Sequence, residues 1–363
     1  MGPRAGAMEN LGVTPTDWKG RRVLVTGHTG LKGSWLCALL LSRGARVFGL
    51  ALAPDTQPAL FEQLGLQRQL GHFLGDIRDA ALVASRIREV RPEVVFHLAA
   101  QPLVRRSYRD PLETWSINVM GTVNVLDALR GWRAPCAVVV VTTDKVYENR
   151  EWEHLYREGD RLGGHDPYSA SKAGTELVVE SYRRSYFTDG PIHLATARAG
   201  NVIGGGDWAQ DRILPDLART RAAGEVLGVR NASAVRPWQH VLDPLVGYLL
   251  LAERLMAGDP RAQTAFNFGP EATNQRSVGE LVDAAGLLWP GHWEDRSDPS
   301  APHEADRLML SIERSRLLLG WTPRWNFARA VCETVSWYRD VAAGVDPRAR
   351  TEAQIATFEG EAA

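Results

Sequence analysis

The sequence feature that most constrains the fold is a glycine-rich turn near the start of the chain. The apolar run Arg22–Thr26 has the composition of a buried strand, and a helical pattern begins at Ser34. Between them, glycines at every third position let the backbone turn tightly and approach a pyrophosphate at the helix N-terminus. A tight turn without a ligand is the alternative interpretation. The turn predicts a dinucleotide site whose contact residues are Gly27, His28, Thr29, Gly30, Leu31, Lys32 and Gly33.

Up to about residue 200, the chain alternates short β-rich runs with longer helical stretches. This alternation is typical of an α/β fold and predicts a Rossmann-like doubly wound parallel sheet. Two of the runs are almost wholly apolar, as expected for strands that are buried on both faces. The further strands are expected at Val47–Leu52, Val94–Ala99 and Ala137–Thr142, and the helices at Ser34–Ser42, Ala80–Val90, Glu113–Leu129 and Ser169–Tyr186.

After residue 200 the sequence becomes rich in loops, with Trp and Arg interleaved. We expect a Rossmann domain over 18–200 that also includes about 238–268. A smaller C-terminal region that binds the substrate is expected to combine 201–237 with 269–345. The two ends of the chain are rich in Gly, Ala and charge, and we expect them to be flexible over 1–17 and 346–363.

Composition excludes several classes of function. The chain has 42 basic and 43 acidic residues and a net charge of −1, so a broad attraction to nucleic acid or to an anionic membrane is not its main activity. No apolar run reaches the roughly 18 residues that span a bilayer, and residues 1–17 contain no apolar block typical of a secretory signal. The cysteines are few and far apart, which argues against a disulfide framework or a metal site and fits a reducing cytoplasm: Cys37, Cys136 and Cys332.

A tyrosine and a lysine four residues apart carry the strongest chemical signal. On the predicted helix, Tyr168 and Lys172 share one face, so the ammonium is expected to favour the phenolate and to lower the pKa of the phenol from about 10. Bringing that pKa close to neutrality requires about 4 kcal/mol of differential stabilisation. The spacing occurs in many helices by chance, but here Thr143 also follows an apolar strand. Together with the glycine turn, these side chains predict hydride transfer with a nicotinamide cofactor.

These motifs, with His97–Ala100 and Asn118 between them, resemble the extended short-chain dehydrogenase/reductase family over roughly residues 20–340. The resemblance implies that Thr143, Tyr168 and Lys172 form a catalytic trio. It also implies that Asn118 supports the helix that brings the active site together. Relatives of this family usually dimerise through two helices of the first domain, so a homodimer or higher homo-oligomer is expected.

The resemblance further implies NAD as the cofactor. The second strand ends without an acid that could hold the ribose hydroxyls and without an arginine cluster for a 2′-phosphate, so NAD rather than NADP is expected. Asp76 and Ile77 are predicted to meet the adenine, and a role of Asp76 as the N-cap of the following helix is the alternative. The remaining cofactor contacts that the resemblance implies are Leu98, Ala99, Ala100, Tyr168 and Lys172.

The two residues after Thr143 narrow the reaction. Nucleotide-sugar 4,6-dehydratases of this family carry Thr-Asp-Glu there, in which the Asp protonates the departing C6 hydroxyl and the Glu removes the C5 proton. Asp144 and Lys145 instead resemble the branch that acts on CDP-glucose, a resemblance shared by the segments 27–35, 101–105, 163–168, 198–208 and 236–240. A charged lysine is a poor base. Three roles therefore stay open for Lys145: transfer of the C5 proton, stabilisation of the enolate, or a structural ion pair.

This resemblance implies that the chain converts CDP-glucose to CDP-4-keto-6-deoxyglucose and water. C4 would be oxidised, water eliminated across C5 and C6, and the hydride returned to C6. The diphosphate is expected to meet arginines, because Arg–phosphate contacts can be bidentate. The predicted substrate contacts are Gln101, Asn201, Arg212, Arg236 and His240.

Other activities on the same scaffold stay open at this point. A nucleotide-sugar 4-epimerase would return the hydride to C4 and would need no acid at C6. A 4,6-dehydratase could act on a different nucleotide sugar, and a net dehydrogenase would accumulate NADH. A non-catalytic NAD-binding protein is the alternative from another class, although such proteins often lose the tyrosine or lysine that this chain keeps.

Overall fold

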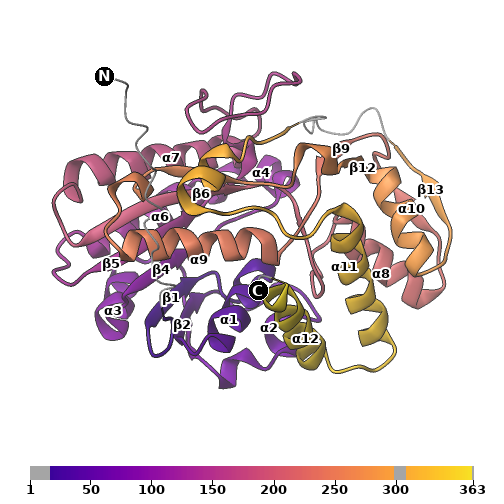
Figure 1. Cartoon of the computed structure of the whole chain (residues 1–363), viewed down its shortest axis with the longest axis horizontal. Helices are drawn as coiled ribbons and strands as arrows, with labels where there is room; N and C mark the ends of the chain where they lie inside the picture. Colours follow the sequence, from indigo (N-terminus) through magenta and orange to yellow (C-terminus); the bar gives the residue numbers. More distant parts are fainter. Residues whose placement is uncertain (1–16, 298–307, 362–363) are drawn as a thin grey trace, which may run out of the picture.

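The computed structural model describes residues 17–297 and 308–361, and its centre is a seven-stranded sheet in the order β11-β6-β5-β4-β1-β2-β3 (Figure 1). All neighbouring strands in it are parallel. The strand order reverses between β1 and β4, so the predicted doubly wound fold is confirmed. The strands are β1 (Arg22–Thr26), β2 (Arg46–Ala51), β3 (Gly71–Leu74), β4 (Val94–His97), β5 (Cys136–Val141), β6 (Ile192–Ala199) and β11 (Ala265–Phe268).

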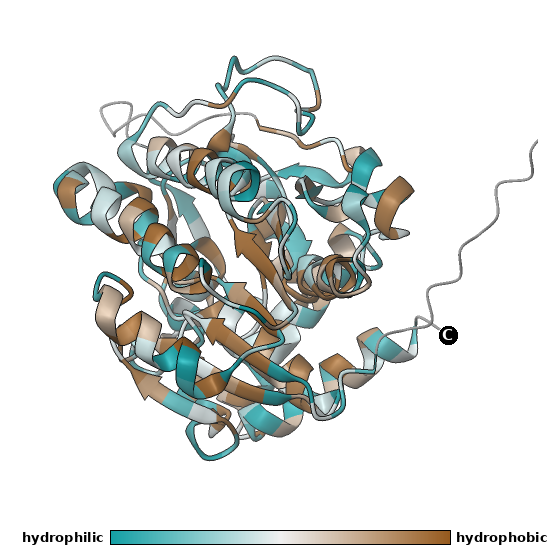
Figure 2. Ribbon diagram, turned by 90° about the vertical axis from the view of Figure 1, so that its left-hand side faces the viewer, coloured by the Kyte–Doolittle hydropathy of each residue, from teal (hydrophilic) through white to brown (hydrophobic). Residues whose placement is uncertain are grey.

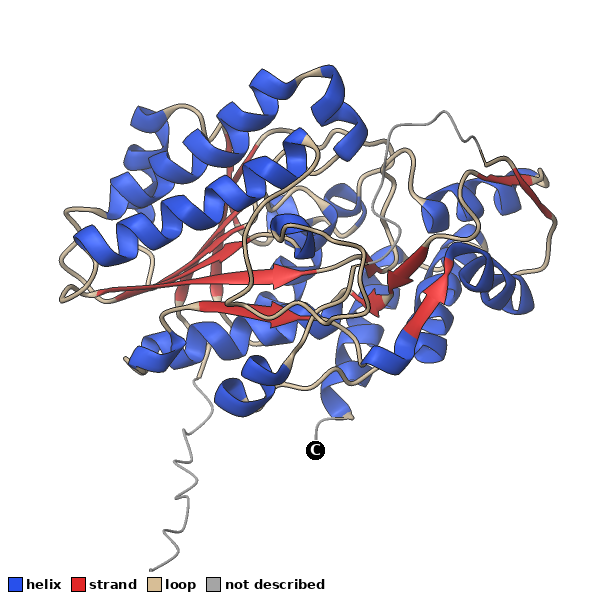
Figure 3. Ribbon diagram, turned by 90° about the horizontal axis from the view of Figure 1, so that it is seen from above, coloured by secondary structure: helices blue, strands red, loops and turns tan. Residues whose placement is uncertain are grey.

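Helices cover both faces of this sheet (Figure 3). One face carries α1 (Leu31–Ser42) and α9 (Leu242–Met256). The other carries α3 (Ala80–Val90), α6 (Gly121–Leu129) and α7 (Pro167–Tyr186). Short elements connect these layers: α2 (Leu60–Gln63), α4 (Val104–Arg109), α5 (Pro111–Trp115), η1 (Leu66–Arg68), η2 (Ser116–Met120), η3 (Asp144–Val146), η4 (Pro260–Ala262), η5 (Ala272–Asn274) and η6 (Ser315–Leu319).

Alternate residues of the strands face two separate cores. Val23 and Val25 of β1 pack on the side of α1 and α9, whereas Leu24 packs on the side of α3 and α6. This division follows from the two-residue period of a strand. β4 and β5 lie in the middle of the sheet and are buried along their whole length, which explains their almost wholly apolar sequences. Figure 2 shows hydrophobic stretches on strands in the interior of the molecule and also on helices around them.

The remaining elements form a smaller region beside the carboxyl ends of the strands (Figure 1). A hydrophobic cluster holds together its helices, α8 (Ile213–Ala223), α10 (Val278–Leu288) and α11 (Phe327–Ala342). α10 begins with a capping box in which Ser277 and Glu280 satisfy each other's backbone N–H groups. Three two-stranded sheets complete the region: β7 (Val202–Ile203) with β10 (Gln239–His240), β8 (Leu227–Val229) with β13 (Trp293–Asp295), and β9 (Val235–Pro237) with β12 (Gln275–Ser277).

The expectation of a flexible end over 346–363 is wrong for most of that segment. Its residues form the helix α12 (Pro347–Gly360), which is capped by the Asp346 side chain. Phe358 is buried and meets the ring of Trp325 edge to face at 4.9 Å. The helix escaped prediction because part of its buried face is polar, including Gln354, which donates a hydrogen bond to the Glu333 carbonyl. Residues 1–16 and 362–363 of the predicted ends lie outside the described residues.

The helix expected over Glu113–Leu129 is interrupted rather than regular. α5 passes into a single turn of π-helix, η2, before α6 continues the same path. Asn118 lies in this turn and is buried. Turns of this kind often occur at functional sites. In the part of the chain that the structure describes, no helix has both the length and the apolar character needed to cross a membrane.

Candidate active site

A cavity of about 820 Å³ opens at the carboxyl ends of the central strands, next to the C-terminal region. This is the place where open α/β sheets bind their ligands, because the connections diverge where the strand order reverses. Thr143 and Lys145 lie in its wall, as do Gln101, Asn201, Arg212 and Arg236. The wall also includes most of the predicted cofactor contacts, namely Gly27, Thr29, Gly30, Leu31, Lys32, Gly33, Asp76, Ile77, Leu98, Ala99, Ala100, Tyr168 and Lys172.

The glycine turn forms a backbone cradle at one end of this cavity. Gly27 has a φ of +76°, and a Cβ atom there would lie 2.7 Å from the backbone nitrogen of Ala99. A Cβ atom on Gly33 would lie 2.1 Å from the Gly27 carbonyl oxygen. Gly30 is the N-cap of α1, and no side chain caps this helix. The turn therefore presents the first N–H groups of α1 to the cavity, which fits a pyrophosphate.

His28 is an exception among the predicted contact residues, because its side chain does not line the cavity. The imidazole is fully buried, and its Nε2 lies 2.7 Å from Nδ1 of His72. It occupies the space above Gly49, where a Cβ atom would come within 2.2 Å of the ring. Burial, followed by repulsion from His72, lowers the pKa of His28 to about 4. The neutral ring therefore fills the core between β2 and α2 instead of lining the cavity.

The predicted catalytic trio is brought together at the end of β5. Thr143 follows this strand directly, and Tyr168 and Lys172 face the cavity from the first two turns of α7. Asp166 caps α7 by accepting a hydrogen bond from the Ser169 amide at 2.9 Å, which fixes where the helix begins. The Lys172 ammonium donates to the Val141 carbonyl over 3.1 Å and so ties the helix to the strand.

The groups of this chain do not produce the expected lowering of the pKa of Tyr168. Burial raises the pKa of the phenol to about 12 and outweighs the opposing hydrogen bond from Thr143. Burial also lowers the pKa of Lys172 to about 8, with repulsion from Lys32 adding to the effect. The prediction placed the lysine correctly on the face of Tyr168, but it omitted the cost of removing both groups from water.

Asp144 and Lys145 follow in the 3-10 turn η3. Lys145 lies in the cavity wall, whereas the Asp144 carboxyl is buried behind it, accepts a hydrogen bond from Thr143 at 2.9 Å and points toward Gly200. Burial raises the pKa of Asp144, although Lys145 and the Thr143 hydroxyl oppose this effect. A raised pKa favours the protonated form that a general acid needs.

Lysines are concentrated at this cavity. The chain has four of them, and three lie in the wall: Lys32, Lys145 and Lys172. The fourth, Lys19, is exposed on the other side of the first strand. Burial lowers the pKa of Lys32 to about 8, with attraction by Asp144 raising it and repulsion from Arg212 lowering it.

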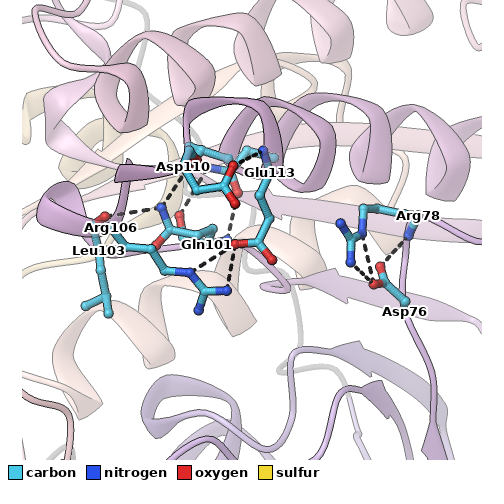
Figure 4. A network of polar contacts seen from close by, with 9 residues as sticks. Asp76, Arg78, Gln101, Leu103, Arg106, Asp110 and Glu113 are labelled. Atoms are coloured by element: carbon cyan, nitrogen blue, oxygen red, sulfur yellow. Dashed lines mark hydrogen bonds and ion pairs between the residues drawn. The ribbon is translucent and has the colours of Figure 1, made fainter. Parts of the chain in front are cut away.

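Gln101 lies in the cavity wall, but its side-chain amide is bonded within the protein, so its contact with the substrate stays a prediction. Its side-chain amide donates to the Thr114 hydroxyl at 2.9 Å, and its carbonyl oxygen accepts from the Leu103 amide at 2.6 Å (Figure 4). Its backbone N–H donates to the side-chain Oδ1 of Asn118, and the side-chain nitrogen of Asn118 donates to the Ser171 hydroxyl on α7. These hydrogen bonds link the loop after β4 to α7.

Figure 4 also shows how Asp76, which lies in the cavity wall, is held by Arg78. Two guanidinium nitrogens of Arg78 lie 2.9 and 2.6 Å from one carboxylate oxygen, and this pair lowers the pKa of Asp76. The alternative role as a helix N-cap is wrong, because Asp79 caps α3 by accepting from the Leu82 amide. The second carboxylate oxygen of Asp76 accepts a hydrogen bond from the Arg78 backbone N–H at 2.8 Å, so Arg78 holds both oxygens in place.

The predicted substrate residues divide into two groups. Asn201, Arg212 and Arg236 lie in the cavity wall, with Arg212 also paired to Asp207 at 2.9 Å. His240 does not, so its predicted role is wrong: the ring is fully buried, 4.7 Å from the ring of Trp325. Burial lowers the pKa of His240 to about 3. Like His28, His240 is a polar residue of a motif whose side chain does not line the cavity.

Sequence reasoning missed a buried ion pair next to the site, between Glu176 on α7 and Arg198 on β6. A usable signal was present, because Glu176 follows Lys172 by four residues and so lies on the same face of the helix. An acid on the buried face of a helix needs a partner.

Comparison with known proteins places the chain in a family. The family model described as GDP-mannose 4,6 dehydratase matches residues 24–334. The chain belongs to this family. Among its curated members and relatives, a CDP-glucose 4,6-dehydratase of Salmonella typhimurium is 43% identical over 94% of this chain and 97% of its own length. A dTDP-glucose 4,6-dehydratase of Streptomyces antibioticus is 34% identical over 90% of this chain and 94% of its own length.

Solved structures share the fold of this dehydratase family member. A UDP-glucose 4-epimerase of Thermus thermophilus in complex with NAD matches with a TM-score of 0.76 and 26% identity, over 88% of this chain and 99% of that protein. A dTDP-glucose 4,6-dehydratase of Bacillus anthracis in complex with NAD matches with a TM-score of 0.74 and 22% identity, over 91% and 100%. The second likeness concerns the fold alone.

Proposed function

We propose that this chain catalyses the 4,6-dehydration of CDP-D-glucose to CDP-4-keto-6-deoxy-D-glucose and water, with NAD as its cofactor. The observation that carries the proposal is that Thr143, Lys145, Tyr168 and Lys172 line one cavity, with the buried Asp144 carboxyl bonded to Thr143 directly behind its wall. An epimerase needs only the first three residues, whereas a dehydratase also needs groups that act at C5 and C6. The near full-length similarity to a CDP-glucose 4,6-dehydratase supports the same assignment.

The residues present fit NAD. The close approach of Gly27 to Ala99 and of Gly33 to Gly27 leaves a backbone cradle for the pyrophosphate. Asp76 and Ile77 would meet the adenosine, and Lys172 the nicotinamide ribose. When bound, NAD supplies the acceptor and later the donor of the hydride, and a positive charge beside Tyr168.

Tyr168 would take the proton of the sugar C4 hydroxyl. Because burial raises the pKa of this phenol to about 12, the chain's own groups keep it protonated until further positive charge is present. Thr143 would hold the sugar C4 hydroxyl in position for this proton transfer. Lys172, which lies on the same face of the helix and whose ammonium donates to the Val141 carbonyl at 3.1 Å, would stabilise the phenolate that forms.

The elimination would use the two residues that follow Thr143. Oxidation at C4 makes the C5 hydrogen acidic. Asp144, whose burial favours its protonated form, would donate a proton to the C6 oxygen as the C6–O bond breaks and water leaves. Lys145, in the cavity wall, would act at C5, either as the amine that takes the proton or as the ammonium that stabilises the enolate.

Replacing Lys145 by alanine should impair the elimination more than the oxidation. We expect exchange of the C5 hydrogen with solvent to fall about 100-fold, as is typical of a lost acid–base group, while oxidation at C4 changes little. Mass spectrometry of sugar incubated in D₂O measures the exchange at C5, and absorbance of the reduced cofactor measures the oxidation at C4. Unchanged deuterium incorporation at C5 would remove Lys145 from the chemistry.

The nucleotide diphosphate would lie across Arg212, Arg236 and Asn201 in the C-terminal wall of the cavity. Incubation with a panel of glucose nucleotides and NAD tests the assignment. We expect CDP-glucose to lose one water, and deuterium placed on C4 to reappear on C6. A product of unchanged mass would indicate an epimerase, net accumulation of NADH a dehydrogenase, and binding of NAD without turnover a non-catalytic protein.

We also propose that the protein acts as a homodimer in a reducing compartment such as the cytoplasm. Its three cysteines form no disulfide. α5 packs closely on α7, since a Cβ atom on Gly174 would lie 3.2 Å from the Trp115 ring. The outer faces of these helices and of η2 expose large apolar side chains that a second copy would cover: Leu112, Trp115, Met120 and Leu177.

A further inference from the structure

The structure contains a buried ion pair that the proposed mechanism does not use. The side chains of Glu176 and Arg198 are each only 4% exposed, and Nη2 of the arginine lies 2.8 Å from Oε2 of the glutamate. The hydroxyls of Thr142 and Thr196 donate to the same carboxylate over 2.5 and 2.8 Å. Burial alone would raise the pKa of Glu176, but Arg198 and the two hydroxyls outweigh it and hold the pKa below its usual range. The pair is therefore charged.

Arg198 extends this network to Tyr147. Its Nη1 donates to the phenol oxygen at 2.9 Å, and the guanidinium lies 5.1 Å from the centre of the ring. Tyr147 in turn donates to Oδ1 of Asn267 at 2.7 Å. The amide of Asn267 donates to the backbone carbonyls of Tyr156 and Ser311. The network therefore connects α7 through β6 to β11 by a continuous series of hydrogen bonds.

The contacts of the network enclose the segment that carries the proposed acid and base. Thr142 and Tyr147 stand at the two ends of this segment, which holds Thr143, Asp144 and Lys145. Glu176 lies on the face of α7 that carries Lys172, one helical turn further on. One ion pair thus fixes the position of the segment 142–147 relative to the catalytic face of the helix.

We propose that Glu176 and Arg198 are positioning residues that couple oxidation at C4 to elimination across C5 and C6. The inference rests on the proposed function, because it requires one reaction in which both sets of groups act in turn on the same sugar. A displacement of about 1 Å in a reacting group costs about 100-fold in rate. A buried network with its partners in place holds one arrangement, whereas a network that loses one partner permits others.

Glu176→Gln tests the coupling directly. A carboxamide has the same size, but its nitrogen accepts no hydrogen bond, so Arg198 or a threonine hydroxyl loses its partner. We expect kcat for CDP-glucose to fall about 10- to 100-fold with KM changed by less than about twofold. Reduced cofactor should accumulate during turnover, because oxidation proceeds while elimination lags. Absorbance of the reduced nicotinamide in stopped flow measures this accumulation, which a loss of stability alone would not produce.

Glu180→Gln is the matched control. Glu180 lies one turn further along α7 and pairs at the surface with Arg183 and Arg184, so the substitution removes the same charge outside the network. We expect it to leave kcat and the cofactor signal unchanged. Arg198→Lys tests the other half of the pair, because one ammonium cannot reach both Glu176 and Tyr147. Network variants that fold and show neither a lower kcat nor accumulated reduced cofactor would overturn the inference.

Tyr147→Phe tests the coupling if the Glu176→Gln and Arg198→Lys variants do not fold. This substitution keeps the ring in the core and removes only the hydroxyl that joins Arg198 to Asn267. We expect a smaller rise in reduced cofactor, about threefold to tenfold below the effect of Glu176→Gln. A Tyr147→Phe enzyme with the wild-type cofactor signal would contradict the proposed coupling.

Hydrogen–deuterium exchange separates this inference from the proposed function. If the wild-type protein does not dehydrate CDP-glucose, the proposed function fails, and the exchange of residues 142–147 becomes the readout. Faster exchange of this segment in Tyr147→Phe but not in Glu180→Gln supports the positioning role. Equal exchange in both variants contradicts it, whatever the substrate.

Discussion

Tyr168 is the residue on which the proposed chemistry depends most directly. Its phenol is buried at the end of β5, and burial raises its pKa to about 12. The hydrogen bond with Thr143 and the charge of Arg212 oppose this effect without reversing it. We therefore expect the phenol to lose its proton only when positive charge is added at the site, which would limit proton loss to the loaded protein.

Tyr168→Phe should abolish turnover without disturbing the cofactor cradle. The substitution removes the proton acceptor at C4, and we expect kcat to fall by about 10²- to 10⁴-fold, the usual contribution of a general base. Binding of NAD, measured by calorimetry, should change little because the glycine turn is untouched. A variant that still exchanges hydride at a near-normal rate would show that another group takes the C4 proton.

Replacing Lys32 by methionine should stabilise the folded protein at pH 7. Burial lowers the pKa of Lys32 from 10.5 to about 8, so below pH 8 the fold holds a charged amine that water would solvate better. The unfolded chain keeps its proton up to about pH 10.5, so this penalty declines as pH rises from 8 to 10.5. We expect a gain of about 1–3 kcal/mol at pH 7 that shrinks towards zero above pH 10.5.

Urea unfolding at several pH values measures this gain. Lys19→Met is the control, because Lys19 is exposed and no buried amine is removed. A gain for Lys32→Met that does not change between pH 7 and pH 10 would show that packing, not charge, is responsible.

At the residue scale, the sequence predicted the composition of the site better than the direction of each side chain. The glycines, Thr143, Tyr168 and Lys172 were correctly placed at the cavity, because each is tied to a strand end or a helix face. His28 and His240 point into the core, since small residues such as Gly49 leave space for the ring there. Such space depends on residues distant in sequence, so the motif alone could not reveal it.

At the scale of elements, β1, β2, β4 and β5 were predicted to within about two residues, whereas β3 and β6 were not predicted as strands. β1 and α3 agree at both ends, because a periodic apolar pattern meets a clear turn or cap at each boundary. α12 was missed, because its inner face includes polar side chains whose partners lie on α11. Those hydrogen bonds are long-range, and a local pattern does not contain them.

Phe358→Ala should test whether α12 is an integral part of the fold. The ring is about 1% exposed and packs against Trp325. Removing it leaves a cavity, and we expect unfolding to become about 3–5 kcal/mol easier. Thr357→Ala, on the exposed side of the same helix, should change stability by less than about 0.5 kcal/mol. Equal effects of the two substitutions in urea unfolding would mean that the helix does not dock in solution.

At the scale of the whole molecule, the exposed apolar residues are unevenly distributed. Those on α5, η2 and α7 form a group on neighbouring helices, whereas Leu287 stands on α10 in the C-terminal region. Grouped apolar side chains on a surface indicate an interface. This is the surface on which the proposed dimer depends.

Leu177→Glu should convert the protein from a dimer to a monomer. A carboxylate on α7 would be buried without a partner at the proposed interface, a change that costs several kcal/mol. Light scattering after size-exclusion chromatography measures the mass. Leu287→Glu introduces the same charge at another exposed leucine and should leave the dimer intact. A Leu177→Glu protein that retains the wild-type mass would place the interface elsewhere.

The gathering of amines around one cavity makes the protein open to selective covalent labelling. Acylating reagents attack the neutral amine, and Lys32 and Lys172, whose pKa values are about 8, present far more of this form near neutrality than an ordinary lysine does. A nucleotide bound in the cavity would shield both of them. Lys19 would still react and would serve as an internal reference for peptide mass mapping of site occupancy.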